Sequence, residues 1–310
     1  MTAAAQTLPA SPAKSYRIAK RALALDGKEL GHLRDANALL GDLPALRQRM
    51  ADDGYLLLRG LVGREKVLDA RQRILEHLGP AVDRNFPFME GRLSAGAKGS
   101  YLGGHRDITH TPEVLDVLEG AELAGFWGGY FEEDPLTIQY KWLRAVGNGD
   151  STPPHYDVVY MGRGTREKLF TCWVPFGDIG YDEGPLALLA GSHNLPGYQK
   201  IRETYGAADA DRDNIETFFS HDPQEIVERY GGQWQTAEFR AGDVIMFGMF
   251  TMHGSVANTS PKLRLSCDVR WQPASEPLDE RWVGETPLGN YAWRKTPVEP
   301  LEVSREKWGV

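Results

Sequence analysis

Short hydrophobic runs that alternate with polar residues dominate the chain from residue 136 onward. Alternation over a few residues, bounded by Gly, Pro and Asp, indicates strands that bury one face. Many such strands separated by tight turns predict a mainly β protein with flanking helices. Its core is expected to be a closed double sheet, a double-stranded β-helix of the jelly-roll or cupin type. The runs that we interpret as strands are residues 137–143, 169–176, 186–189, 244–250 and 263–271.

The first half of the chain has a different texture, with a short strand and helices. Residues 55–60 predict a buried strand, and apolar residues at helical spacing over 67–78 predict a helix that stops before a Gly-Pro pair. Thr111 is expected to cap a further helix that begins with Pro112. The chain therefore surrounds its strands with helices rather than repeating a single motif.

Two segments lack this periodicity and are expected to shape a pocket. Residues 81–110 are Gly-rich and irregular, as lids and substrate loops often are. Residues 197–235 form a polar insertion, with one helix expected near its end. No internal repeat is visible, so we expect one domain over residues 41–310, preceded by a flexible tail over residues 1–40.

Composition and charge exclude several classes of protein. The net charge of −8 and the lack of a basic stripe argue against a nucleic-acid partner. No apolar run approaches the ~18 residues of a membrane helix. The two cysteines, Cys172 and Cys267, exclude a disulfide framework and a thiolate zinc site, and they indicate a reducing, cytoplasmic location. Residues 1–25 carry basic residues but no acid, so organellar import through them is the alternative.

One pair of polar residues in the strand-rich half has the form of a metal-binding motif. His155 and Asp157 are two residues apart, so on a strand both side chains would point to one face and Tyr156 to the other. A distant His that joins such a pair completes the 2-His-1-carboxylate triad. This triad holds non-heme Fe(II) and leaves positions open for O₂ and a co-substrate. An isolated HxD pair is weak evidence, because it arises often by chance.

The rest of the chain decides between this pair and its rivals. A second HxD pair, His105 and Asp107, lies in the Gly-rich segment without alternation around it, and we interpret it as a loop or helix entry. His253 follows a long apolar run and is expected at the end of that strand, where a ligand would reach the mouth of a barrel. Three other histidines look like turns or helix ends, namely His110, His193 and His221. We therefore predict His155, Asp157 and His253 as the catalytic metal ligands.

Arg264 lies between two leucines in an otherwise apolar strand. An Arg on a strand is usually a surface residue, but an inward guanidinium at this position would need a carboxylate partner. The neighbouring sequence supplies no obvious one. A bound dicarboxylate would satisfy Arg264 through a bidentate fork.

Assembled in order, these residues resemble the phytanoyl-CoA dioxygenase (PhyH) family of Fe(II)/2-oxoglutarate-dependent oxygenases. The similarity spans about residues 45–275. The segments that carry it are an opening strand at 52–60, the Pro-His-Tyr-Asp sequence at 154–157, a Trp-containing strand at 170–176, the Gly-Pro-Leu and Gly-Ser-His sequences at 184–186 and 191–193, the stretch 242–255, and Arg264.

The resemblance implies an Fe(II)/2-oxoglutarate-dependent dioxygenase that oxidises a C–H bond of a small organic metabolite, with hydroxylation as the main expectation. The enzyme would convert 2-oxoglutarate and O₂ to succinate and CO₂, with ascorbate as a candidate reductant. The triad would bind iron. Arg264 would bind the distal carboxylate of 2-oxoglutarate, and Ser255 would add a hydrogen bond. Trp173 and Tyr140 would face this co-substrate from strand positions.

The resemblance also limits the chemistry. Relatives that halogenate replace the triad carboxylate by a small residue, and the retained Asp157 favours oxidation instead. For the further basic contact to 2-oxoglutarate that the family often uses, the only candidates are Lys98 and Lys141. Two alternatives to the dioxygenase stay in view: a cupin-like metal-binding or sensor protein without turnover, and a metal-dependent hydrolase or isomerase on the same barrel. The sequence specifies neither the substrate nor the oligomeric state.

Overall fold

The computed structural model describes residues 14–289, 291, 293 and 295–310. Their strands form a large sheet of seven, a small sheet of four and a two-stranded sheet within residues 15–24. The large sheet contains, in order, β4 (Tyr55–Leu58), β11 (Val244–Gly248), β8 (Phe170–Pro175), β13 (Arg264–Pro273), β7 (Trp142–Val146) and β5 (Ser100–Tyr101), and β6 (Pro135–Thr137) pairs with the far end of β13. The small sheet contains β12 (His253–Ser255), β9 (Leu186–Leu189), β10 (Trp234–Thr236) and β3 (Leu30–His32).

The two sheets pack face to face and enclose an apolar core. Trp173 and Phe247 of the large sheet meet Leu186 and Leu188 of the small sheet there, together with Phe239. Strand neighbours are antiparallel except for β10 and β3, which are parallel. The mainly β, jelly-roll core is thus confirmed.

Closure of the two sheets into one is not observed among the described residues. The segment 147–154, between β7 and the HxD pair, consists of turns and loop. A single antiparallel bridge, between His155 and His253, follows it. The expectation of a closed sheet is therefore wrong, because turns interrupt the strand that would complete it.

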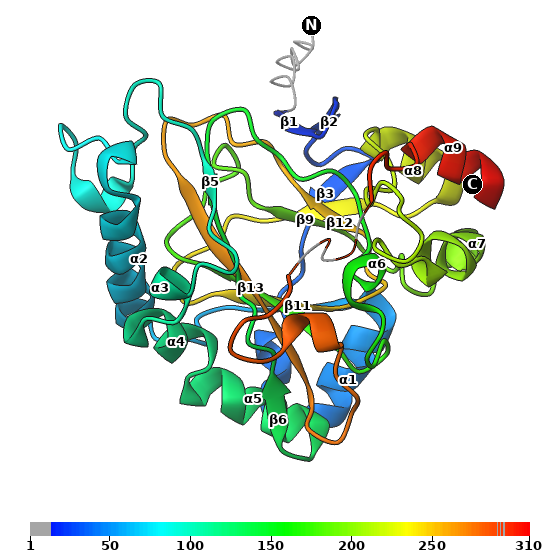
Figure 1. The fold of residues 1–310 in the computed structure, drawn as a ribbon, viewed down its shortest axis with the longest axis horizontal. Helices are drawn as coiled ribbons and strands as arrows, with labels where there is room; N and C mark the ends of the chain where they lie inside the picture. Colours follow the sequence, from blue (N-terminus) through cyan, green and yellow to red (C-terminus); the bar gives the residue numbers. More distant parts are fainter. Residues whose placement is uncertain (1–13, 290, 292, 294) are drawn as a thin grey trace, which may run out of the picture.

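Helices cover the outer faces of both sheets (Figure 1). On the large sheet, the apolar side of β13 packs in one cluster with buried residues of the helices, including Ile74, Leu118 and Trp127. Figure 1 shows the remaining long helices on the other side of the molecule, where they pack against β9 and β10. The first group is α1 (Leu43–Asp53), α2 (Arg64–Leu78), α4 (Pro112–Leu118) and α5 (Ala121–Phe131), and the second is α7 (Gln199–Glu203), α8 (Pro223–Tyr230) and α9 (Leu301–Trp308).

Most of the predicted elements are confirmed, with changes in their bounds. Strands β4, β8, β9 and β11 lie within the predicted runs, β13 continues two residues past its run to Pro273, and α2 begins earlier, at Arg64, but ends at Leu78 as expected. The predicted strand over 137–143 is wrong, because it divides into β6 and β7. Between them, the buried ammonium of Lys141 donates to the carbonyl of Ile138 at 2.5 Å and pairs with Glu119 at 2.6 Å. The Ile138 carbonyl that accepts from Lys141 lies inside the predicted run, so the Lys141 side chain folds back on this segment at the break.

Two predictions about local structure need correction or restriction. Thr111 occupies the N-cap position of α4, but its hydroxyl donates to the carbonyl of Ile108 and does not cap the helix. The Gly-rich segment 81–110 is largely irregular, as expected, with the 3-10 turn Phe88–Glu90, β5 and the short α3 (Arg106–Thr109) in it.

The expected tail over residues 1–40 is structured where it is described. Residues 15–32 form β1 (Ser15–Ile18), β2 (Arg21–Ala24) and β3, and β3 extends the small sheet. Residues 1–13, which hold the first half of the candidate targeting segment, lie outside the described residues. In the described part of the chain, no helix is long and apolar enough to cross a membrane.

Candidate metal centre and active site

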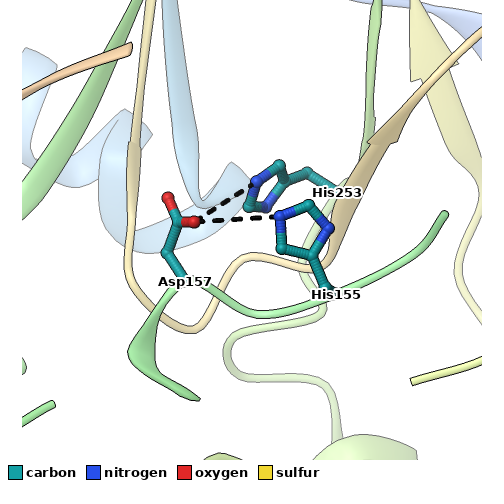
Figure 2. A group of neighbouring side chains, drawn as sticks. All are labelled: His155, Asp157 and His253. Atoms are coloured by element: carbon teal, nitrogen blue, oxygen red, sulfur yellow. Dashed lines mark ion pairs between the residues drawn. The ribbon is translucent and has the colours of Figure 1, made fainter. Parts of the chain in front are cut away.

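Three side chains from two distant parts of the chain meet between the two sheets. His155, Asp157 and His253 are all buried, and their potential ligand atoms lie within 4.8 Å of one another. Oδ1 of Asp157 is 3.8 Å from Nε2 of His155 and 3.7 Å from Nε2 of His253 (Figure 2). Among the described residues this is the one His/Cys/Asp/Glu group arranged to hold a metal ion. The rival pair at His105 and Asp107 is exposed and joins no such group.

The HxD pair does not lie on a strand, which corrects the predicted geometry. His155 pairs with His253 in an isolated bridge, but Asp157 has helical dihedrals, with φ −67° and ψ −28°, and directly precedes α6 (Val158–Met161). The two side chains converge because the chain changes from extended to helical between them. Tyr156 points away, as expected, and its hydroxyl donates to the carbonyl of Ser192.

Backbone carbonyls fix the ring orientation of both histidines. Nδ1 of His155 lies 2.9 Å from the carbonyl oxygen of Pro153, and Nδ1 of His253 lies 3.0 Å from that of Thr251. A carbonyl oxygen only accepts, so Nδ1 must carry the proton and Nε2 presents its lone pair to the centre. Burial, and next the neighbouring His253, lowers the pKa of His155 to about 3, so its imidazole stays neutral. A neutral imidazole is the form that binds a metal.

The carboxylate of Asp157 is oriented by two donors on the large sheet. The hydroxyl of Thr171 on β8 donates to Oδ2 at 2.6 Å, and Nη2 of Arg270 on β13 donates to the same oxygen at 2.9 Å. Burial alone would raise the pKa of Asp157, but Arg270 and the two histidines lower it below its usual range. Since Oδ2 is occupied, Oδ1 is left to face the histidines as a single anionic ligand atom.

His253 does not end the strand at 244–250, as predicted, but begins β12 in the other sheet. The turn before it is tied down by Ser192, whose Oγ accepts the backbone N–H of Met252 at 2.8 Å. Thr251 adds a hydrogen bond from its hydroxyl to the carbonyl of Gly54 at 2.9 Å. The Gly-Ser-His sequence at 191–193 therefore has a physical role, because its Ser positions the strand that carries a candidate ligand.

Arg264 is buried without an acidic partner among the described residues. It is 3% exposed, one terminal nitrogen donates to Ser266, and its Nε has no hydrogen-bond partner. Burial, and next the charge of Arg144, lowers the pKa of Arg264 to about 10, so the side chain is still a cation at neutral pH. An unpaired buried guanidinium is costly, which makes this end of the site suitable for a carboxylate ligand.

The other residues predicted to contact a co-substrate divide into two groups. The Oγ of Ser255 accepts the backbone N–H of Thr152 at 2.8 Å and can still donate its own hydrogen. Trp173 lies between the sheets, with its ring centroid 5.9 Å from the guanidinium of Arg264. The structure thus brings Trp173 to Arg264. Tyr140 is outside the cavity at the triad, with its ring centroid 4.7 Å from that of Trp142 in a tilted contact, and it lies in the break between β6 and β7 rather than on a strand.

Neither lysine proposed as a further basic contact reaches the triad in the structure. Lys98 is exposed, and Lys141 is committed to Glu119. Sequence reasoning also missed Thr171, Arg144 and Arg270. A signal for the last was available, since every second residue of β13 from Arg264 to Gln272 is polar, and all of these polar side chains are buried.

Comparisons with known proteins agree with this geometry. The family model described as phytanoyl-CoA dioxygenase (PhyH) matches residues 50–266. A 1-deoxypentalenic acid 11-beta-hydroxylase from Streptomyces exfoliatus is 28% identical over 259 residues, covering 78% of this chain and 85% of the relative. The non-heme alpha ketoglutarate dependent carbocyclase SnoK has a similar structure, with a TM-score of 0.55 at 18% identity, covering 87% of this chain and 96% of SnoK. The epimerase SnoN, solved with Fe³⁺, alpha ketoglutarate and nogalamycin RO, has a TM-score of 0.55 at 19% identity, covering 84% and 98% of the two chains.

Proposed function

The chain belongs to the phytanoyl-CoA dioxygenase family and is an Fe(II)/2-oxoglutarate-dependent dioxygenase, and we propose that it hydroxylates a C–H bond of a small organic metabolite. In this proposal His155, Asp157 and His253 are the iron ligands. Arg264 binds the distal carboxylate of 2-oxoglutarate, supported by Ser255 and Trp173. The products of the co-substrate are succinate and CO₂.

The main support for the proposal is a set of three potential metal ligands whose remaining polar atoms are already hydrogen-bonded to the protein. Two Nε2 atoms and one carboxylate oxygen face a common point, while Nδ1 of each His and Oδ2 of Asp157 are bound to the protein. Two imidazoles and one carboxylate form the set that suits non-heme Fe(II) and leaves open positions. Outer hydrogen bonds of this kind are a regular part of metal sites. The residues present therefore fit iron.

The co-substrate fits for a separate reason. Arg264 is a buried cation whose Nε lacks a partner in the described residues, and the fork of a guanidinium matches a carboxylate in two hydrogen bonds. Ser255 offers a hydroxyl hydrogen from the neighbouring β12. Trp173 adds an apolar ring 5.9 Å from the guanidinium of Arg264. An acid with two carboxyl ends would thus relieve the unpaired charge of Arg264 while its other end faces the triad.

The residues of the chain would bind the metal and the co-substrate, hold them in a fixed orientation and exclude water from the site. Iron with 2-oxoglutarate and O₂ supplies the oxidative decarboxylation and the C–H oxidation. Thr171 and Arg270 hold Asp157 so that one oxygen faces the metal position, and the bridge between His155 and His253 fixes the separation of the two rings. The inter-sheet core keeps water away from the triad.

Two alternatives receive less support from the geometry. A metal-binding sensor without turnover would have no need for Arg264 to be buried as an unpaired cation. A hydrolase or isomerase on the same scaffold would work without O₂ and without 2-oxoglutarate. Halogenation is disfavoured because Asp157 is present and is held by two donors.

The deciding experiment measures succinate release by purified protein supplied with Fe(II), 2-oxoglutarate and O₂, including release uncoupled from any substrate. The His253→Ala variant is expected to lose metal binding and succinate release while its circular dichroism stays unchanged. His32→Ala is the matched control, because His32 is exposed and pairs with Asp26 instead. Turnover by the wild type without O₂ or 2-oxoglutarate, or normal succinate release by His253→Ala, would reject the proposal.

The role of Arg264 can be tested with a variant that removes its charge and that we expect not to destabilise the protein. Arg264→Met removes a buried, unpaired charge, so the metal-free variant is expected to be at least as stable as the wild type. Saturating 2-oxoglutarate at 100 times its Kd would stabilise the metal-loaded wild type by about 2.7 kcal/mol, whereas the variant would gain far less. Thermal unfolding with and without 2-oxoglutarate measures both effects. Equal ligand stabilisation of the two proteins would remove Arg264 from the co-substrate site.

We also propose that the enzyme works in a reducing, cytoplasmic compartment, with a small molecule and O₂ as its partners. The support is the pair of buried free thiols, Cys172 and Cys267, which lie in the outer core of the large sheet. Ascorbate is proposed as a reductant that keeps the iron in its Fe(II) state. Succinate release with and without added ascorbate would test this part.

A further inference from the structure

A cavity of about 200 Å³ lies directly beside the triad. Its walls come from the large sheet, the loop before the HxD pair, α6, the polar insertion and the C-terminal segment. The residues that line it are Trp142, Arg144, Ser151, Thr152, Pro153, His155, Asp157, Tyr160, Met161, Phe218, Arg270 and Tyr291. The cavity contains two of the three candidate iron ligands, so a molecule bound in it would lie next to the metal position.

One wall of the cavity is aromatic. The rings of Tyr160 and Phe218 approach His155 edge-on, with centroids 5.7 Å and 5.9 Å from it. Tyr291, from the C-terminal segment, extends this wall, with its ring 6.2 Å from Tyr160. We call these three residues the aromatic wall. Such a surface favours contact with the apolar body of a ligand.

The side chain of Arg144 adds a positive charge to the lining of the same cavity. Arg144 projects from β7, and within the described residues it makes a single hydrogen bond, through Nε to Asp268 at 3.4 Å. Its guanidinium also lies 5.2 Å from the ring of Tyr101. The side chain is 32% exposed. Its two terminal nitrogens therefore have no protein partner among these residues, although they are the pair that best grips a carboxylate.

The other charged residues of the cavity point to the triad or are buried. Arg270 donates to Asp157 through one terminal nitrogen, and its Nε and Nη1, which have no hydrogen-bond partner among the described residues, are fully buried, while Asp157 faces the metal position. Arg264 does not line this cavity, and it precedes Arg270 by six positions on β13. Arg144 lies opposite Ser266, between these two arginines of β13. Arg144 is thus the cation left available on the open side of the triad.

We propose that the substrate is a small organic acid whose carboxylate is bound by Arg144 and whose apolar body packs on the aromatic wall. This inference rests on the proposed dioxygenase function and names its substrate class. Fixing the acid at Arg144 and the body beside His155 would present one C–H bond of the body to the metal position and hold the others away. A carboxylate of 2-oxoglutarate is the competing occupant of Arg144, because both ligands share the same chemistry.

The test uses binding, so that it does not depend on turnover. Protein loaded with Ni(II) and 2-oxoglutarate is titrated calorimetrically with cyclohexanecarboxylate, 1-naphthoate and 2-naphthylacetate, and with the primary amide of each acid. The amide keeps the size and removes the charge. At least one acid is expected to bind the wild type about tenfold or more tightly than its amide, since a charge-assisted hydrogen bond contributes that much.

Three variants assign the effect to a residue. Arg144→Gln is expected to reduce binding of the acid to the level of its amide, with the 2-oxoglutarate affinity within about twofold of the wild type. Arg144→Lys should keep part of the preference for the acid, because it retains the charge but loses the fork. Arg92→Gln is the matched control, since Arg92 is also 32% exposed, pairs with one acid and packs on one aromatic ring, but does not line the cavity.

Each outcome bears on the inference. If no acid of the panel binds the wild type, or if acids and amides bind alike, the inference is overturned. If Arg144→Gln weakens the binding of 2-oxoglutarate as much as Arg264→Met does, Arg144 is part of the co-substrate site and the inference again fails. The prior titration of 2-oxoglutarate separates these failures from a failure of the proposed function, because a protein that binds no 2-oxoglutarate would refute the function itself.

Discussion

The hydrogen bond from Thr171 to Asp157 allows a sharp test of how the sheet prepares the metal site. The hydroxyl of Thr171 is 2.6 Å from Oδ2 of Asp157 and is completely buried. Thr171→Val removes this bond at nearly constant volume. The carboxylate then keeps Arg270 as its donor to Oδ2 and can rotate, so that Oδ1 no longer faces the two histidines in a fixed orientation.

The expected effect on metal binding follows from the strength of that bond. A hydrogen bond to a charged group contributes about 1.5–3 kcal/mol, and loss of an outer partner of a metal ligand typically costs about 10–100-fold in metal affinity. We therefore expect Thr171→Val to weaken Fe(II) binding by about 10–100-fold. An anaerobic competition titration against a coloured chelator measures the change. The 2-oxoglutarate affinity of the metal-saturated variant should change far less.

A second buried threonine provides the control. Thr236 on β10 is also completely buried, and its hydroxyl donates to the carbonyl of Leu186 at 2.7 Å, away from the triad. Thr236→Val should lower the free energy of unfolding by about 1–3 kcal/mol, as Thr171→Val should, because each leaves a buried acceptor with one partner fewer. Only Thr171→Val should weaken the binding of Fe(II). Equal metal affinities for the two variants would refute the idea that Thr171 orients Asp157.

Two further predictions concern the backbone around His253 and a charge cluster beyond the site. A Cβ at Gly254 would lie 2.7 Å from the carbonyl oxygen of Thr152, so Gly254→Ala should displace the loop before the HxD pair and weaken metal binding. The control is Gly125→Ala, in an open position of α5, which should instead raise the free energy of unfolding by roughly 0.5–1 kcal/mol. Burial would raise the pKa of Asp209, but the Arg163 hydrogen bond and other cations lower it to about 2. Because the folded pKa lies below the ordinary value, this stabilisation is complete above about pH 4 and is lost as the pH falls toward 2. Asp209→Asn should thus cost about 2 kcal/mol in urea unfolding at pH 7 and clearly less at pH 3, whereas a constant difference would contradict this assignment.

The strand pattern could be predicted because it follows from burial on one or both faces. Strands β8, β11 and β13 appear in the sequence as apolar or alternating runs, since their outer side chains must pack under the helices. The division of the run at 137–143 could not be predicted in this way. It depends on Lys141, whose buried ammonium pairs with Glu119, the residue directly after α4. A contact between distant residues overrides the local alternation at that point.

The three candidate metal ligands could be chosen from the sequence, but the backbone geometry expected for them was partly incorrect. The expectation placed His155 and Asp157 on one strand, because a period of two points alternate side chains to one face. In the structure Asp157 is already helical, and the convergence depends on hydrogen bonds from Thr171 and Arg270. Residue identity was informative because the chemistry of iron selects it. The local backbone was not, since partners from two other strands determine it.

The alternation along β13 shows what a closer inspection of the sequence would have found. Its apolar positions pack in the outer core, whereas its polar positions are buried between the two sheets. A buried sheet face that is polar at every position contradicts ordinary core packing, and each of its members needs a partner. Arg270 has Asp157, but Arg264 has no acid among the described residues. Because Arg264 is a buried cation without an acid, we expect an acidic ligand at this end of the strand, independently of any resemblance to a family.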